Sequence, residues 1–122
     1  MKVSQMPYEH IPLEELKSGM EAIIAGVKRA ATVEEVLAQR EKYLALTRRL
    51  RTASSLCEIR YTCNTADEYY VAEHDYFDQI GPEISNLDNE YGRALLEHPL
   101  RPQLEQALSP VYFRYLEVQD KA

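Results

Sequence analysis

Three histidines are the first side chains in this sequence that could bind a metal ion or accept a proton in catalysis. They stand at positions 10, 74 and 98. A zinc-peptidase helix needs two histidines four residues apart, with a glutamate between them to activate water. A di-iron bundle needs a glutamate three residues before a histidine. His10, His74 and His98 satisfy neither spacing, so we predict no metal site and no cofactor within this chain.

The remaining reactive side chains do not complete a site. His74 and Asp78 have the spacing of two ligands on one helix, but we interpret them as an exposed hydrogen bond on a helix surface. Cys57 and Cys63 fit neither a zinc knuckle nor a disulfide framework. We therefore expect two reduced thiols, a cytoplasmic location and no catalytic residue in this chain.

The charges are unevenly distributed along the chain. The net charge is −6, made up of +2 over residues 1–61 and −8 over residues 62–122. This acidity opposes nucleic-acid binding, and no apolar run is long enough to suggest a membrane span. We expect the arginines of the first half to face the acids of the second, with Arg60 partly buried against Asp67 or Glu68. The two predicted groups are Arg48, Arg49, Arg51 and Arg60, and Asp67, Glu68, Glu73, Asp75 and Asp78.

Helical periodicity runs through most of the sequence. Apolar residues recur at three- and four-residue spacing between positions 13 and 27, which predicts a helix over residues 12–30. The sequence TVEE at residues 32–35 is a capping box and opens a second helix over 32–62. The sequence TADE at residues 65–68 repeats this pattern, with Thr65 as the expected cap of a third helix over 66–97. We expect Pro82 to kink the third helix without ending it.

The C-terminal quarter predicts shorter elements. Prolines at positions 99 and 102 stop the third helix, and two short helices follow, over about 102–108 and from Ser109 onward. The chain breaks off within the last pattern without a terminal cap, which suggests a piece of a longer protein. We predict an all-α chain: an antiparallel bundle of three long helices with two short C-terminal helices, forming a single domain over residues 1–122.

The junction of the second and third helices carries the most recognisable sequence. Residues 58–70 read EIRYTCNTADEYY, and AEHDYFD follows at 72–78. This segment resembles the N-terminal region of the oligoendopeptidase F family of zinc metallopeptidases, in which Ile-Arg-x-Thr leads through Thr-x-Asp-Glu-Phe/Tyr-Tyr into an acidic and aromatic helix. The resemblance extends from residues 7–9 to ALLEHPLR at 94–101. The turn or interface residues that we single out are Arg60, Thr65, Asp67, Glu68 and Tyr69.

The resemblance implies an accessory role. In that family a helical N-terminal domain precedes and partly roofs the catalytic domain of a cytoplasmic oligopeptidase, while the His-Glu-x-x-His motif and the third ligand lie downstream. It therefore implies zinc and short peptide substrates for the parent enzyme, a catalytic domain of the same polypeptide as partner, and an inactive chain in isolation. The alternative is a free-standing helical interaction module that forms a homodimer or another homo-oligomer; a small helical enzyme is a third, weaker class.

Overall fold

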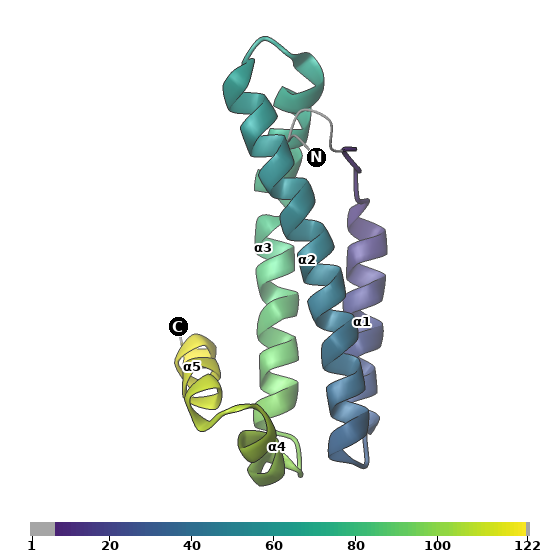
Figure 1. Cartoon of the computed structure of the whole chain (residues 1–122), viewed down its shortest axis with the longest axis vertical. Helices are drawn as coiled ribbons and strands as arrows, with labels where there is room; N and C mark the ends of the chain where they lie inside the picture. The colour runs from purple at the N-terminus through teal and green to yellow at the C-terminus, as the bar shows by residue number, and fades with distance from the viewer. Residues whose placement is uncertain (1–6, 122) are drawn as a thin grey trace.

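The computed structural model describes residues 7–121, which form five helices (Figure 1). The three long helices are α1 (Leu13–Arg29), α2 (Val33–Cys63) and α3 (Glu68–Leu96). Two short helices follow, α4 (Arg101–Leu108) and α5 (Pro110–Lys121). No strand is present between residues 7 and 121. The predicted all-α architecture is confirmed, and the helix boundaries agree with the sequence-based ones to within two residues.

The three long helices form an antiparallel bundle, and each contacts the other two. Short turns at residues 30–32 and 64–67 reverse the chain between them. Helix α5 packs on α3 and α4 and lies beside the half of the bundle that is distant from the α2–α3 turn (Figure 1). The fold is therefore a long bundle with two small helices attached at one end.

Local signals explain where the helices begin. The Thr32 hydroxyl accepts a hydrogen bond from the Glu35 amide (3.2 Å), and the Glu35 carboxylate accepts one from the Ala31 amide (2.8 Å). The predicted capping box thus forms, with its return contact one residue before the cap. Pro82 lies inside α3, so the prediction that it does not end the helix is confirmed.

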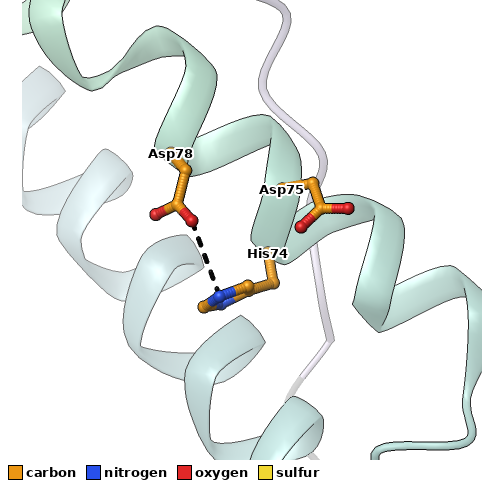
Figure 2. Close-up of side chains that lie close together, drawn as sticks. All are labelled: His74, Asp75 and Asp78. Atoms are coloured by element: carbon orange, nitrogen blue, oxygen red, sulfur yellow. Dashed lines mark ion pairs between the residues drawn. The ribbon is translucent and has the colours of Figure 1, made fainter.

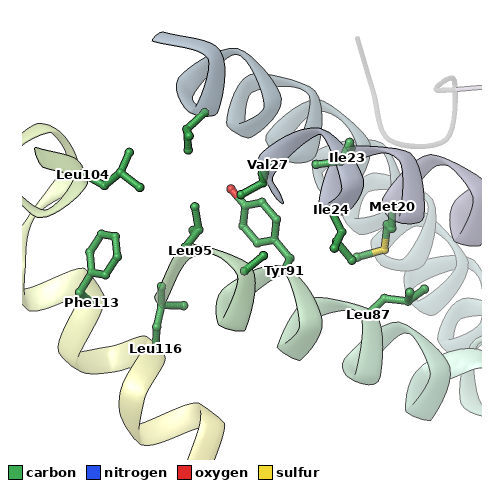
Figure 3. Packing of buried hydrophobic residues seen from close by; sticks show 12 residues of the cluster. Met20, Ile23, Ile24, Val27, Leu87, Tyr91, Leu95, Leu104, Phe113 and Leu116 are labelled. Carbon is green, nitrogen blue, oxygen red and sulfur yellow. The ribbon is translucent and has the colours of Figure 1, made fainter. Parts of the chain in front are cut away.

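The apolar core is divided into two clusters along the bundle. The larger cluster joins α1, α2 and α3 to α4 and α5, and its members labelled in Figure 3 are Met20, Ile23, Ile24, Val27, Leu87, Tyr91, Leu95, Leu104, Phe113 and Leu116. The second cluster consists of Ile11, Leu16, Ala53 and Ile80. Full burial of one valine, leucine, isoleucine, phenylalanine or methionine side chain stabilises the fold by about 1.5–3 kcal/mol. The larger cluster therefore attaches α4 and α5 to the bundle.

The middle of α2 is covered much less than the other long helices. No residue from Leu37 to Thr52 is buried, although α2 is buried at Val36 before this stretch and again from Ala53 onward. At about 1.5 Å per residue the uncovered stretch is about 24 Å long. This side of the bundle is the one that a neighbouring element could still cover.

Candidate functional site

The α2–α3 turn holds the residues that the sequence singled out. Asp67 is the N-cap of α3, because its Oδ1 accepts hydrogen bonds from the amides two and three residues later (3.0 and 3.4 Å). The prediction that Thr65 caps the helix is wrong: Thr65 lies within the turn. Asn64 explains the difference, since its carbonyl accepts from the Asp67 amide (3.2 Å) and delays the helix until Glu68.

Aromatic contacts close this turn. The Arg60 guanidinium donates from Nη1 to the Tyr70 hydroxyl (2.7 Å) and lies 5.6 Å from the centre of the Tyr70 ring. Tyr70 is thus one partner of Arg60, for which the sequence suggested a carboxylate. Tyr69 is exposed, and its ring meets that of Tyr8 edge-on with centroids 5.9 Å apart. These contacts join α2, α3 and the segment before α1.

Arg49 also departs from the predicted pairing with the acids of the second half. Its guanidinium forms ion pairs with Glu9, in the segment before α1, and with Glu15 of α1 (2.6 Å to the second). All three side chains are partly exposed, so each pair contributes under about 1 kcal/mol. The charge of Arg49 is thus paired within the first half of the chain.

A buried carboxylate lies one turn into α3. Glu73 is only 6% exposed, and it accepts a hydrogen bond from the Tyr8 hydroxyl (2.7 Å). Its two oxygens lie 2.8 and 2.9 Å from Nδ1 of His10. The Tyr76 hydroxyl donates to the Ile11 carbonyl (2.7 Å) beside them. Because a buried charge must be paired and hydrogen-bonded, this network fixes residues 8–11 on α3.

Glu73 was expected to face the arginines of the first half together with its acidic neighbours, and this prediction is wrong, because its partners are Tyr8 and His10. A signal was present, because Glu73 stands four residues after Tyr69 and three before Tyr76, on the apolar stripe of the helix. The acidic residues on either side of Glu73 made this signal easy to miss. Its partners Tyr8 and His10 are more than sixty positions away in the chain, which no local pattern can reveal.

The thiol beside this network is poorly suited to nucleophilic chemistry. Cys57 is buried, with its Sγ 4.0 Å from the Tyr70 carbonyl oxygen. Burial raises the pKa of the Cys57 thiol, and the negative charges of Glu73 and Glu58 raise it further. A reactive cysteine needs the opposite environment, one that stabilises the thiolate. Cys63 is exposed, and both cysteines are free.

One cluster on the surface combines an imidazole with carboxylates. Ligand atoms of His74, Asp75 and Asp78 lie within 4.8 Å of one another on α3 (Figure 2). Nε2 of His74 is 3.6 Å from Asp78, Nδ1 is 3.1 Å from Glu58 of α2, and the ring stacks on Tyr61. Both ring nitrogens therefore already face carboxylates. The sequence predicted a hydrogen bond between His74 and Asp78, whereas their contact is a looser ion pair and the hydrogen bond of His74 is to Glu58.

The other two histidines are held by partners of their own. His98 is buried, with Nε2 3.1 Å from the Ala30 carbonyl oxygen, and its Nδ1 accepts from the Leu100 amide (3.0 Å). These bonds require the tautomer that carries its proton on Nε2. His98 thus connects the end of α1 to the α3–α4 turn, while His10 binds Glu73. Among residues 7–121 no two histidines belong to one cluster of metal-ligand atoms.

A groove of about 500 Å³ runs between α2, α3 and α5. In its wall the Tyr43 hydroxyl donates to Asp88 (2.6 Å), and the Tyr43 ring stacks on Tyr91 with centroids 3.8 Å apart. Burial raises the pKa of Asp88 more than this hydrogen bond lowers it. The Tyr91 hydroxyl is buried and has no hydrogen-bond partner among the described residues. Arg40 lies over the Tyr112 ring, 5.9 Å from its centre.

Comparison with known proteins matches the whole chain to part of a larger enzyme. The sequence model of the peptidase M3 N-terminal domain family matches residues 3–122. A solved structure of a protein assigned as an oligoendopeptidase F has a TM-score of 0.94 and 34% identity, and the match covers 99% of this chain and 21% of that one. The structure of PZ peptidase A with an inhibitor has a TM-score of 0.93 and 32% identity, and the match covers 98% of this chain and 21% of that one.

A third structure, assigned as an oligoendopeptidase F from Bacillus anthracis, has a TM-score of 0.91 and 28% identity over 97% of this chain and 22% of that one. No curated protein matches the chain. The chain thus spans about a fifth of the length of the solved structures that it resembles.

Proposed function

Because the chain belongs to the peptidase M3 N-terminal domain family, we propose that it is the accessory helical domain of a zinc-dependent oligoendopeptidase. One observation carries this proposal: nearly every residue of the chain matches these structures, yet the match uses only about a fifth of each of them. The remaining four-fifths of such an enzyme would then contain the catalytic domain, which is the partner that we propose for this chain.

The residues described here do not fit a catalytic zinc ion. The cluster at His74 offers one imidazole whose two nitrogens already face carboxylates, and its acids Asp75 and Asp78 are exposed. A peptidase site needs two imidazoles and a carboxylate on the zinc ion, with one position left open for water. When bound in the catalytic domain, zinc would activate water and polarise the peptide carbonyl. We therefore assign no step of peptide hydrolysis to this chain and expect it to be inactive alone.

We assign the bundle a role in limiting access to the active site. At about 1.5 Å per residue α2 extends about 46 Å, long enough to border one side of a substrate cleft. The two core clusters and the Glu73 network hold the helices of the bundle together. Such a wall beside the cleft would admit short, unfolded peptides and exclude folded proteins. The free cysteines fit a reducing compartment, and we propose the cytoplasm.

The nucleotide sequence that follows codon 122 tests this function. We expect it to continue in frame and to encode His-Glu-x-x-His with a later glutamate. The polypeptide that it encodes should contain one zinc ion and hydrolyse internally quenched peptides of a few residues. A natural stop directly after Ala122, with no such motif, would contradict the proposal.

The alternative, a free-standing interaction module that forms a homodimer, has one observation in its favour. Helix α5 exposes Val111, Tyr115 and Val118, an apolar surface of the kind that often marks an interface. Multi-angle light scattering over a dilution series separates the two functions. A mass that falls from dimer to monomer on dilution supports the alternative, whereas a monomer at every concentration contradicts it.

A further inference from the structure

Helix α5 is apolar on two opposite sides, and the bundle covers only one of them. Phe113 and Leu116 are buried against the core. Val111, Tyr115 and Val118 are 68%, 61% and 70% exposed, and their spacing of four and three residues places them on one stripe. At about 100° per residue the apolar side chains of α5 span roughly 220° of its circumference. A surface helix needs only about 100°, so α5 has the pattern of a helix covered from two directions.

The exposed stripe continues into the α2–α5 groove, because Tyr115 belongs to both. The opposite wall of the groove comes from α2 between Arg40 and Ser55, which includes most of the stretch that has no buried residue. Helices α2 and α5, which are both incompletely covered, thus line the same groove. The stripe and the groove form one surface, which we call the α2–α5 surface.

One polar group on this surface lacks a partner within the described part of the chain. Arg40 is half-buried and is not that group, because it lies over the Tyr112 ring and interacts with the Tyr112 hydroxyl, although no carboxylate of the described residues lies within 4.0 Å of it. Tyr91 is 2% exposed, and its hydroxyl has no hydrogen-bond partner between residues 7 and 121. Buried polar groups are normally paired, so the unpartnered Tyr91 hydroxyl beside this groove indicates that a further element belongs there.

We propose that the polypeptide segment that follows residue 122 binds to the α2–α5 surface. This inference rests on the proposed function, since it places the remainder of the peptidase on one defined face of the bundle. The segment should present apolar side chains to the α5 stripe and an oxygen acceptor, a carboxylate or carbonyl, to Arg40. The solved structures that match this chain extend it about fivefold, which provides ample chain for such a segment.

Tethering favours this segment over a second copy of the chain. Helix α5 ends at Lys121, and Gln119 in its last turn lines the groove, so a following segment starts beside the α2–α5 surface. A tether of a few residues gives an effective concentration in the millimolar range. A homodimer at micromolar concentration would need about 800 Å² on each partner, drawn from 20–30 residues. Twelve residues of α5 beside a groove suit the tethered segment better.

Thiol accessibility tests the proposal directly. A cysteine introduced by Val118→Cys lies on the stripe, and the natural Cys63, exposed at the far end of the bundle, is an internal reference. Maleimide modification at both thiols is followed by peptide mass spectrometry in the 122-residue chain and in the polypeptide that continues beyond codon 122. We expect the introduced thiol to react at least about 10-fold more slowly in the longer polypeptide, and Cys63 equally fast in both. Val111→Cys provides a second position on the same stripe.

Each other result contradicts the inference. Equal rates at the introduced thiol in both polypeptides would show that the stripe stays uncovered. Protection that grows with the concentration of the 122-residue chain would identify a second copy, and protection that requires an added peptide would identify substrate as the occupant. Absence of His-Glu-x-x-His after codon 122 refutes the proposed function by itself. The labelling rates show whether the α2–α5 surface is covered, even if the following segment is not a peptidase.

Discussion

Removal of one hydroxyl should detach the segment before α1 from the bundle. In Tyr8→Phe the ring keeps its edge-on contacts with Tyr69 and Tyr70, while the hydrogen bond to Glu73 is lost. A hydrogen bond to a charged group contributes about 1.5–3 kcal/mol, and Glu73 stays buried with only His10 to compensate its charge. We therefore expect the free energy of unfolding to fall by about 1.5–3 kcal/mol, or the melting temperature to fall by roughly 5–15 °C.

Urea unfolding followed by circular dichroism at 222 nm measures this change, with Tyr115→Phe as the matched control. Tyr115 is 61% exposed, so loss of its hydroxyl should change the stability by less than about 0.5 kcal/mol. Hydrogen exchange should also speed up at the amides of residues 8–11, because this segment depends on the Glu73 network. If both variants lose the same stability, or exchange at residues 8–11 is unchanged, the network does not hold the segment and the reasoning is wrong.

Three further changes test other contacts. Arg60→Ala should lower the free energy of unfolding by about 1–2 kcal/mol, because it removes a hydrogen bond and a cation–π contact. Arg49→Ala should lower it by under about 1 kcal/mol, because the ion pairs of Arg49 are partly exposed. Equal losses of stability in thermal melts would contradict this. Gly92→Ala places a methyl group 3.2 Å from a side chain of α5, so it should gain less than the about 0.5–1 kcal/mol of an unhindered exchange in a helix, or destabilise; a gain of about 1 kcal/mol in urea titrations would refute this. Since burial raises the pKa of Asp88 in the folded chain, its contribution to stability falls as pH rises through that pKa, so Asp88→Asn should be more favourable relative to the parent chain at pH 7 than at pH 3.5. Urea titrations at both values check the sign, and a less favourable effect at pH 7 would contradict it.

The helices could be predicted from sequence because their signals are local. The Thr32 capping box and the prolines at positions 99 and 102 act within one turn of their own position, and the boundaries follow them. The start of α3 was misplaced because two cap sequences compete there, and Asn64 turns the chain so that Asp67 caps the helix. The propensities of residues for the N-cap position alone do not decide between Thr65 and Asp67.

The buried network could not be predicted because it depends on contacts between distant residues. Glu73 resembles its exposed acidic neighbours in sequence, and only the packing of Tyr8 and His10 over it shows that it is buried. The same limit applies to Arg60, whose aromatic partner Tyr70 stands two or three residues after the carboxylates that the charge pattern favoured. The resemblance to the oligoendopeptidase F family, by contrast, depends on contiguous residues and was accessible from the sequence.

The most direct test of the account compares zinc content and peptide hydrolysis between two purified polypeptides: the 122-residue chain and the one that continues beyond codon 122. Elemental analysis and an internally quenched peptide provide the two readings. We expect one zinc ion per chain and peptide cleavage from the longer polypeptide, and neither from the 122-residue chain. Stoichiometric zinc together with cleavage by the 122-residue chain alone would contradict the central claim that this bundle is an accessory domain.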